Sequence, residues 1–181
     1  MKNSGINSAF VVKVGSLLNR HVEEIVVESR GFLSEIENSI CKVRDDTPII
    51  FNFTLENGAN GVVVRGKIVS TWEGTCRRCL TRLKGNIEAQ IGEIYVPDPD
   101  IETEYLLENE NVDLSFAIRD ALILELPLAP LCKIDCLGLC SVCGADRNES
   151  PCQCYESQGR DEFSALKILL DHSDTESEKA N

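Results

Sequence analysis

Alternating apolar and polar residues in the middle of the chain predict three β-strands. Residues Ile49 to Leu55 combine β-branched and aromatic side chains with partial alternation, and the turn signal Asn57-Gly58 follows them. Residues Gly61 to Thr71 read as a second strand, so we expect these two strands to form a hairpin. Between Asn86 and Val96 apolar residues again alternate with polar ones, which predicts a third strand.

Helical spacing appears later in the chain. Asp113 offers an N-cap for a helix through about Leu126, in which apolar residues recur on one face, and Pro127 ends that helix. A short amphipathic helix is predicted at about Asp161 to Leu170, and the acidic tail that follows it is expected to be disordered.

The remaining segments carry weaker patterns. Short apolar runs at Phe10 to Val14 and Ile25 to Val27 predict two short strands near the N-terminus. The segment that follows Val96 is acidic and broken by Pro97 and Pro99, so we expect a surface loop as far as the helix that begins near residue 113.

Overall composition fits a globular chain with an acidic balance. The 181 residues carry a formal net charge of −12, with 43% hydrophobic and 27% charged residues, values that favour neither a wholly disordered nor a membrane protein. No apolar run approaches the roughly 20 residues that span a bilayer. The first apolar stretch is cut by Lys13 and Gly15, which is untypical of an export signal. We therefore expect a cytoplasmic protein, in which thiols stay reduced unless they bind metal or do redox chemistry.

Cysteine is the residue that composition singles out, with nine in the chain against two histidines. Eight of the nine form close pairs, whose members are Cys76 with Cys79, Cys132 with Cys136, Cys140 with Cys143 and Cys152 with Cys154. Two such pairs readily supply the four thiolates of a tetrahedral zinc site. The sequence therefore predicts one or two structural zinc ions.

Ligand pairing stays open at this level. Gly138 and Gly144 favour knuckle turns around the pairs, because such turns need backbone angles that glycine adopts cheaply. A neat partition would place the last two pairs in one site and the first two in another, while a single zinc with the remaining thiols unused is an alternative. An iron–sulfur cluster would also take four cysteines, but the spacings lack ferredoxin runs. A redox dithiol at Cys76 and Cys79 lacks the expected βαβ context, and Cys41 fits a small buried hydrophobe.

Three stretches of sequence together resemble the YceD family of large ribosomal RNA subunit accumulation proteins, in its cysteine-rich branch. They are Gly74-Thr-Cys76-Arg-Arg-Cys79-Leu80, then Leu126-Pro-Leu-Ala-Pro130-Leu-Cys132, then Cys136-Leu-Gly-Leu-Cys140-Ser-Val-Cys143-Gly144 with the Cys152-Gln-Cys154 pair. The resemblance covers roughly residues 49–170, and Glu162 and Phe163 depart from the pattern of the family's closing helix.

This resemblance implies a non-catalytic factor that supports accumulation or maturation of large-subunit (23S) ribosomal RNA. Its partners would be that RNA, a precursor particle or a ribosomal protein, with no membrane and no small-molecule substrate. The residues add little support for an enzyme, because no acid–base pair, nucleophile arrangement or phosphate-binding glycine motif stands out.

Charge along the chain is uneven in a way that bears on RNA. From Arg65 to Lys84 the local charge is +5, although Glu73 lies within this stretch. The candidate RNA-binding residues are Arg65, Lys67, Arg77, Arg78, Arg82 and Lys84. Phosphate neutralisation by Lys and Arg supplies most non-specific RNA affinity, so any contact is expected to be local to this stretch. Two rival interpretations are an acidic zinc-stabilised adaptor for a basic ribosomal protein, without RNA contact, and a thiol redox sensor.

These patterns together predict an α+β protein. Residues 1–130 would form an antiparallel β-rich body with the helix at about 113–126, residues 131–155 a cysteine-rich zinc module, and residues 156–181 a terminal helix with an acidic tail.

Overall fold

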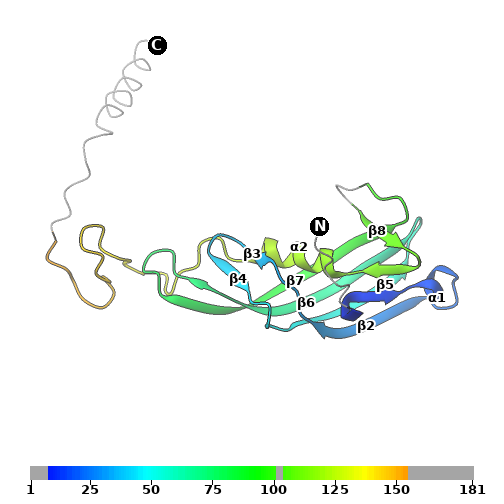
Figure 1. Ribbon diagram of the computed structural model, residues 1–181, viewed down its shortest axis with the longest axis horizontal. Coiled ribbons are helices and arrows are strands. Elements are labelled where there is room, and N and C mark those ends of the chain that lie inside the picture. The colour runs from blue at the N-terminus through cyan, green and yellow to red at the C-terminus, as the bar shows by residue number, and fades with distance from the viewer. Residues whose placement is uncertain (1–7, 101–103, 155–181) are drawn as a thin grey trace, which may run out of the picture. The chain divides into compact units, whose positions relative to one another are not determined.

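The computed structural model describes residues 8–100 and 104–154 of the chain, and β-structure dominates them (Figure 1). The chain divides into two compact units, Met1–Cys136 and Leu137–Asn181. The elements lie in the first unit: η1 (Ser8–Phe10), β1 (Val11–Lys13), α1 (Gly15–Leu18), β2 (Glu24–Gly31), β3 (Ile36–Glu37), β4 (Cys41–Val43), β5 (Ile49–Asn57), β6 (Val62–Thr75), β7 (Arg82–Val96), β8 (Tyr105–Glu108), β9 (Asn111–Asp113) and α2 (Ser115–Glu125).

Three long antiparallel strands, β5, β6 and β7, form the centre of the sheet. Asn57 at the end of β5 pairs with Val62 at the start of β6, which confirms the predicted hairpin. β6 and β7 pair along their whole length, from Val62 with Tyr95 to Thr75 with Arg82. The predicted third strand is present but begins at Arg82, four residues before the alternation becomes visible in the sequence. The turn between β6 and β7 is thus held at the end of a long two-stranded ladder.

Shorter strands complete the sheet on both sides of this centre. β2 pairs with β5, and β4 pairs with the end of β6, where Cys41 lies opposite Gly74. On the other side β7 pairs with β8 in parallel, so the predicted antiparallel arrangement is wrong at this pair. β8 continues through β9 to β1 in antiparallel fashion. The close approach of β4 requires Gly74, because a Cβ atom there would lie 2.7 Å from the Cys41 sulfur.

One predicted loop is wrong in part. The described residues of the acidic segment after Val96 include β8 and β9, joined by a turn in which Asn109 and Glu110 have φ of 49° and 60°. Two residues with positive φ are the requirement of a tight hairpin turn, and asparagine tolerates that conformation. Burial of Leu107 and Val112 gives these short strands a reason to pair. The prolines and acidic residues concealed this pattern.

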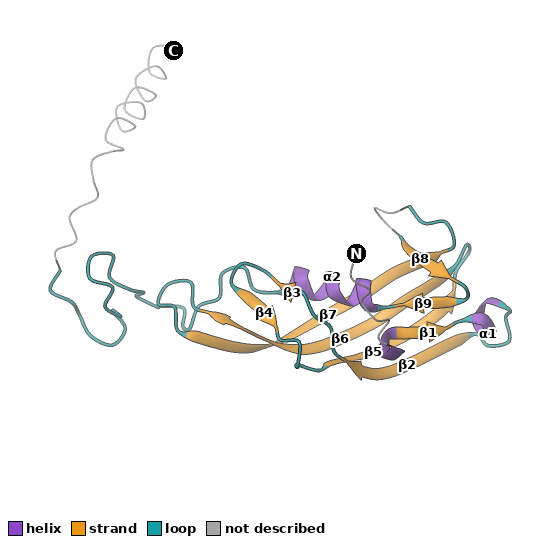
Figure 2. Cartoon of the chain, in the orientation of Figure 1, coloured by secondary structure: helices purple, strands orange, loops and turns teal. Residues whose placement is uncertain are grey.

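A hydrophobic core covers one face of the sheet. Phe51 stacks between Phe10 and Phe53, with ring centroids 5.4 Å and 5.2 Å apart. Helix α2 lies over this face beside β7 (Figure 2), and its residues Ala117, Ile118 and Leu122 are buried in the same core. The predicted helix is therefore confirmed, with the N–H of its first residue donating to the side chain of Asp113 at 2.9 Å.

The described residues are β-rich, with only α1 and α2 as α-helices, so the α+β class is a coarse description of them. The helix predicted at about Asp161 to Leu170, and the tail after it, lie outside the described residues. Cys132 and Cys136 belong to the first unit, with the sheet.

Candidate metal centres and a basic surface

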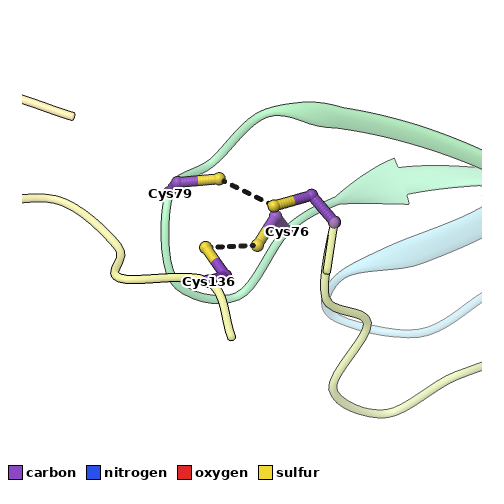
Figure 3. A group of neighbouring side chains, drawn as sticks. Cys76, Cys79 and Cys136 are labelled. Carbon is purple, nitrogen blue, oxygen red and sulfur yellow. Dashed lines mark hydrogen bonds between the residues drawn. The ribbon is translucent and has the colours of Figure 1, made fainter. Parts of the chain in front are cut away.

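The turn between β6 and β7 brings the first two cysteine pairs together. Cys76 and Cys79 lie in the turn, while Cys132 and Cys136 lie in the segment after α2. Figure 3 shows Cys136 facing the sulfurs of the turn. Each of the four residues offers one sulfur, and the four sulfurs lie within 4.8 Å of one another. Segments more than 50 residues apart in the chain thus meet at one group of thiols.

The sulfur–sulfur distances have the size expected around one ion. The Cys76 and Cys136 sulfurs are 3.8 Å apart, and those of Cys79 and Cys132 are 3.5 Å apart. A tetrahedron with metal–sulfur bonds of about 2.3 Å has edges of about 3.8 Å. An iron–sulfur cluster with several irons would hold its cysteines farther apart. The geometry therefore fits a single four-coordinate ion.

Backbone hydrogen bonds fix the first knuckle. The N–H of Cys76 donates to the carbonyl of Thr81 at 2.8 Å, and the N–H of Leu80 donates to the carbonyl of Cys76 at 3.0 Å. The N–H of Arg78 points at the Cys76 sulfur at 3.4 Å. The N–H of Arg77 donates to the carbonyl of Pro130 at 2.9 Å, which ties the turn to the segment that carries the other two ligands.

The second unit repeats this knuckle around the other two pairs. Cys140, Cys143, Cys152 and Cys154 also place one sulfur each within 4.8 Å of the others. The N–H of Cys140 donates to the carbonyl of Ala145 at 2.8 Å, and the N–H of Gly144 donates to the carbonyl of Cys140 at 2.9 Å. The N–H of Val142 points at the Cys140 sulfur at 3.4 Å. The two groups thus match the predicted partition, in which the first two cysteine pairs form one site and the last two pairs form the other.

Little besides these thiols holds the described part of the second unit together. The side chain of Asn148 accepts a hydrogen bond from the N–H of Leu137 at 2.9 Å, and the N–H of Arg147 donates to the carbonyl of Gly138 at 3.0 Å. Among residues 137–154 the buried positions are Gly138 and Cys140, and Leu137 is 58% exposed. A unit with so few buried apolar side chains depends on another source of stability.

Backbone N–H groups lower the pKa of one thiol in each group. Burial opposes ionisation of Cys76, but the N–H groups of Cys79, Cys132 and Arg78 outweigh it and lower the pKa of Cys76 to about 6. In the second group the N–H groups of Cys143 and Val142 lower the pKa of Cys140 to about 6. A thiolate in each group is ready to bind a cation, and metal binding displaces the protons of the remaining thiols.

Hydrogen bonds between thiols raise the pKa of other cysteines in the two groups. Donation by Cys132 to Cys136, followed by burial, raises the pKa of Cys132, and donation by Cys154 to Cys143 raises that of Cys154. Cys41, the unpaired cysteine, is buried in the core of the sheet, and burial raises its pKa. This placement agrees with its interpretation as a small hydrophobe.

The residue after the second knuckle cysteine differs between the two groups and provides a test of the backbone. Leu80 has φ of 61° and Gly144 has φ of 73°. A leucine pays about 1 kcal/mol in this left-handed region, whereas glycine does not. Leu80→Gly is therefore expected to lower the apparent dissociation constant of the first metal by up to about fivefold, and Gly144→Ala to raise that of the second by a similar factor.

Chelator competition on the two variants measures both shifts. Leu80→Ala is the matched control, because it removes the exposed side chain but keeps the positive φ. An equal gain in Leu80→Ala and Leu80→Gly would contradict the backbone explanation.

The predicted RNA-binding residues of β6 and β7 share one exposed face of the ladder but are spread along its length. Arg65 pairs with Gly92, whereas Arg82 pairs with Thr75, so about 33 Å of strand separates Arg65 from Arg82. Lys67 forms an ion pair with Glu88 at 2.5 Å. The continuous basic stretch of the sequence is thus divided along the ladder.

The two arginines of the turn also differ. The guanidinium group of Arg78 donates to the carbonyl of Cys136 at 2.9 Å, so it helps to hold the ligand segment. Arg77 is exposed.

A basic patch forms where β4 meets the β6–β7 ladder. We define it by four exposed cations, Lys42, Arg44, Arg82 and Lys84, which line one cavity of about 560 Å³. Glu73 of β6 lies opposite Lys42 on β4 and opposite Lys84 on β7. Glu37 is the other carboxylate of the cavity wall. Arg44 also donates to Asp46, at 2.7 Å and 2.8 Å, and this bond lowers the pKa of Asp46.

Two members of the basic patch were missed by the sequence analysis. Lys42 and Arg44 lie more than 20 residues before the basic stretch and reach Arg82 and Lys84 only through the pairing of β4 with β6. A three-residue strand gives too short a pattern for its partner to be predicted. The alternation Lys42, Val43, Arg44, with the valine buried, was the available signal.

The chain is similar to several known proteins. The family described as "Large ribosomal RNA subunit accumulation protein YceD" matches residues 64–170. Two similar relatives are uncharacterised mycobacterial proteins: one of Mycobacterium tuberculosis is 32% identical over 129 residues, which are 67% of this chain and 62% of the relative. One of Mycobacterium leprae is 29% identical over 120 residues, which are 62% of this chain and 55% of the relative.

A plant relative carries a descriptive name. The Arabidopsis thaliana protein "Large ribosomal RNA subunit accumulation protein YCED homolog 1, chloroplastic" is 38% identical over 55 residues, which are 30% of this chain and 16% of the relative. The chain thus spans less than two thirds of the length of these relatives. No solved structure matches the chain significantly. Among the described residues, no helix has the length and apolar character needed to cross a bilayer.

Proposed function

The chain belongs to the YceD family of large ribosomal RNA subunit accumulation proteins, and from this premise we propose that it is a non-catalytic ribosome-biogenesis factor acting in the cytoplasm. It supports the accumulation or maturation of 23S ribosomal RNA by binding that RNA or a precursor particle. The observation that carries the proposal is the position of the basic patch, directly beside a hairpin turn that a four-thiolate metal site can hold rigid.

Zinc is the proposed ion in both thiol groups. Cys76, Cys79, Cys132 and Cys136 would hold one ion, and Cys140, Cys143, Cys152 and Cys154 the other. The donor set supports zinc, because four thiolates at tetrahedral distances match its structural sites. A site closed by four thiolates leaves no open position for a substrate, so the zinc would be structural.

The basic patch is the proposed RNA contact. Arg82 and Lys84 come within the first three residues of β7, directly after the turn that carries Cys76 and Cys79. A metal in the first group would fix the turn and therefore the positions of these two side chains. Lys and Arg side chains on a rigid surface bind phosphate oxygens without reading the base sequence. Arg77, exposed in the turn itself, extends the patch.

Arg65, Lys67 and Arg78 contribute less to the proposed contact than the sequence alone predicts. Lys67 is engaged by Glu88, and Arg78 by the Cys136 carbonyl. Arg65 lies about 33 Å of strand away from Arg82, so it would touch RNA only where the nucleic acid follows the sheet.

A salt series on binding to fragments of 23S ribosomal RNA tests the proposal. We expect measurable association at low salt, with the logarithm of the binding constant falling by roughly 0.7 to 0.9 per phosphate neutralised for each tenfold rise in salt. Arg44 is engaged by Asp46, so the other three patch cations and Arg77 predict a slope of about −3. Absence of association at low salt would remove direct RNA contact from the proposed function.

The rival thiol redox sensor makes a different prediction. Zinc-bound thiolates resist alkylation, whereas sensor thiols are exposed and reactive. Complete protection of the eight paired cysteines in the purified protein, and loss of that protection with chelator, is the result expected for structural metal.

A further inference from the structure

A second cavity lies on the same sheet as the basic patch but has the opposite chemistry. It has a volume of about 490 Å³, and we call it the acid–aromatic pocket. Its aromatic and apolar wall comprises Tyr95, Tyr105, Leu106 and Phe116, and its carboxylates are those of Glu108 and Asp113. The pocket is lined by residues of the neighbouring strands β7, β8, β9 and β1, by Asn109 in the turn between β8 and β9, and by the first turn of α2.

The aromatic wall is rigid. The rings of Tyr95 and Tyr105 stack with centroids 5.2 Å apart. The hydroxyl of Tyr95 donates to the carbonyl of Asp113 at 3.2 Å, and that of Tyr105 donates to the carboxylate of Asp120 at 2.9 Å. These bonds fix the orientation of both rings before any ligand arrives.

Negative charge gathers around these rings. None of the described residues that line the pocket is a lysine or an arginine. Glu93 and Asp120 do not line the pocket, but their charges act on both tyrosines, and burial and then the charge of Asp120 raise the pKa of Glu93. Carboxylates this crowded are stabilised by a cation brought among them.

Two apolar side chains of the pocket wall face solvent. Phe116 is 57% exposed and Leu106 is 52% exposed. The guanidinium group of Arg119, whose Nε also donates to the carbonyl of Ser34, lies 5.8 Å from the centre of the Phe116 ring. The ring already attracts one cation of the chain itself, because the face of an aromatic ring attracts guanidinium and ammonium groups, and its exposed part can receive a second.

We propose that the acid–aromatic pocket binds an arginine or lysine side chain of a basic protein segment, with the cation against Glu108 and Asp113 and its methylene stem against Tyr105, Leu106 and Phe116. Charge complementarity selects this occupant, since a ribonucleotide would bring its phosphates against the same carboxylates. Arginine fits better than lysine, because its flat guanidinium stacks on aromatic rings and binds carboxylates in a bidentate way. The site does not depend on RNA contact at the basic patch, so either can fail without the other.

Fluorescence anisotropy with a labelled peptide of alternating glycine and arginine tests this site on the metal-loaded full chain. The matched probe replaces every arginine with citrulline, which keeps the shape and hydrogen-bonding edge but removes the charge. We expect saturable binding of the arginine peptide and at least tenfold weaker binding of the citrulline peptide. Equal binding of the two peptides, or no saturable binding of the arginine peptide, would overturn the proposal.

Variants distinguish the pocket from general attraction to an acidic protein. Phe116→Ser and Glu108→Gln are each expected to weaken the arginine peptide by about threefold or more. Leu124→Ser, on the same helix and 84% exposed, and Glu28→Gln, an exposed acid on β2, are the matched controls and should leave affinity within about 1.5-fold. Equal losses in the controls would assign the binding to overall charge.

A labelled single-stranded RNA tests the competing occupant on the same variants. We expect Phe116→Ser and Glu108→Gln to leave RNA affinity unchanged. Weaker RNA binding by Phe116→Ser but not by Leu124→Ser would assign the pocket to a nucleobase and overturn the proposal.

Discussion

Cys140→Ser is expected to unfold the described part of the second unit and to remove one metal ion from the chain. Residues 137–154 bury no large apolar side chain, so the metal is the main source of their stability. Amide exchange in this segment should accelerate by about 100-fold or more. A metal whose free concentration is at least about 100 times its dissociation constant stabilises the folded segment by that factor, and the variant loses this stabilisation. Elemental analysis and hydrogen exchange followed by mass spectrometry measure both effects on one sample.

Cys76→Ser is the informative companion, because its group lies on a folded sheet. This variant should also lose one ion, yet amides in the core of β5, β6 and β7 should stay protected, since Phe51, Phe53 and Ile68 are buried independently of the thiols. Cys41→Ala, which removes the thiol outside both groups, should retain two ions. Two ions in Cys140→Ser would contradict the assignment of Cys140 as a ligand, and iron in place of zinc would change the proposed cofactor.

The two knuckles explain why the cysteine groups could be predicted from the sequence. The members of each pair are separated by at most three residues, and this spacing along the chain is visible without a structure. Gly144 was a further local signal, since its left-handed backbone is the one glycine adopts cheaply. Leu80 at the equivalent position gave no such signal, because leucine rarely occupies that conformation. The sequence therefore predicted the donors but not the common backbone of the two turns.

Long-range pairing accounts for what the sequence could not predict. The central hairpin has many alternating residues and a turn signal, so its strands were visible. β4, β8 and β9 have three or four residues each, and their partners depend on the sheet as a whole. The basic patch and the acid–aromatic pocket are both built on such short strands. This is why local charge predicted one contiguous basic stretch, whereas the fold divides it and adds Lys42 and Arg44.

Neutralising the basic patch is expected to weaken RNA binding more than any other change of surface charge. In Lys42→Gln/Arg82→Gln/Lys84→Gln the three exposed side chains keep much of their length, and none of them is buried, so the sheet should remain folded. Each lost phosphate contact lowers the salt slope by roughly 0.7 to 0.9, so the triple variant should lower it by about 2 to 3 and reduce affinity at least tenfold at moderate salt. The salt series on a 23S fragment measures both quantities.

A matched triple variant makes that result specific to the patch. Lys13→Gln/Arg20→Gln/Arg30→Gln changes the net charge by the same amount at exposed cations outside the basic patch, on β1, β2 and the turn after α1. If binding depended only on the balance of charge over the whole chain, both triple variants would lose affinity equally. Because phosphate contacts act within a Debye length of about 8 Å at physiological salt, we expect the control to retain most of its affinity and slope. Equal losses would move the RNA contact away from the hairpin turn, and the thiol group there would then stabilise the sheet without positioning RNA.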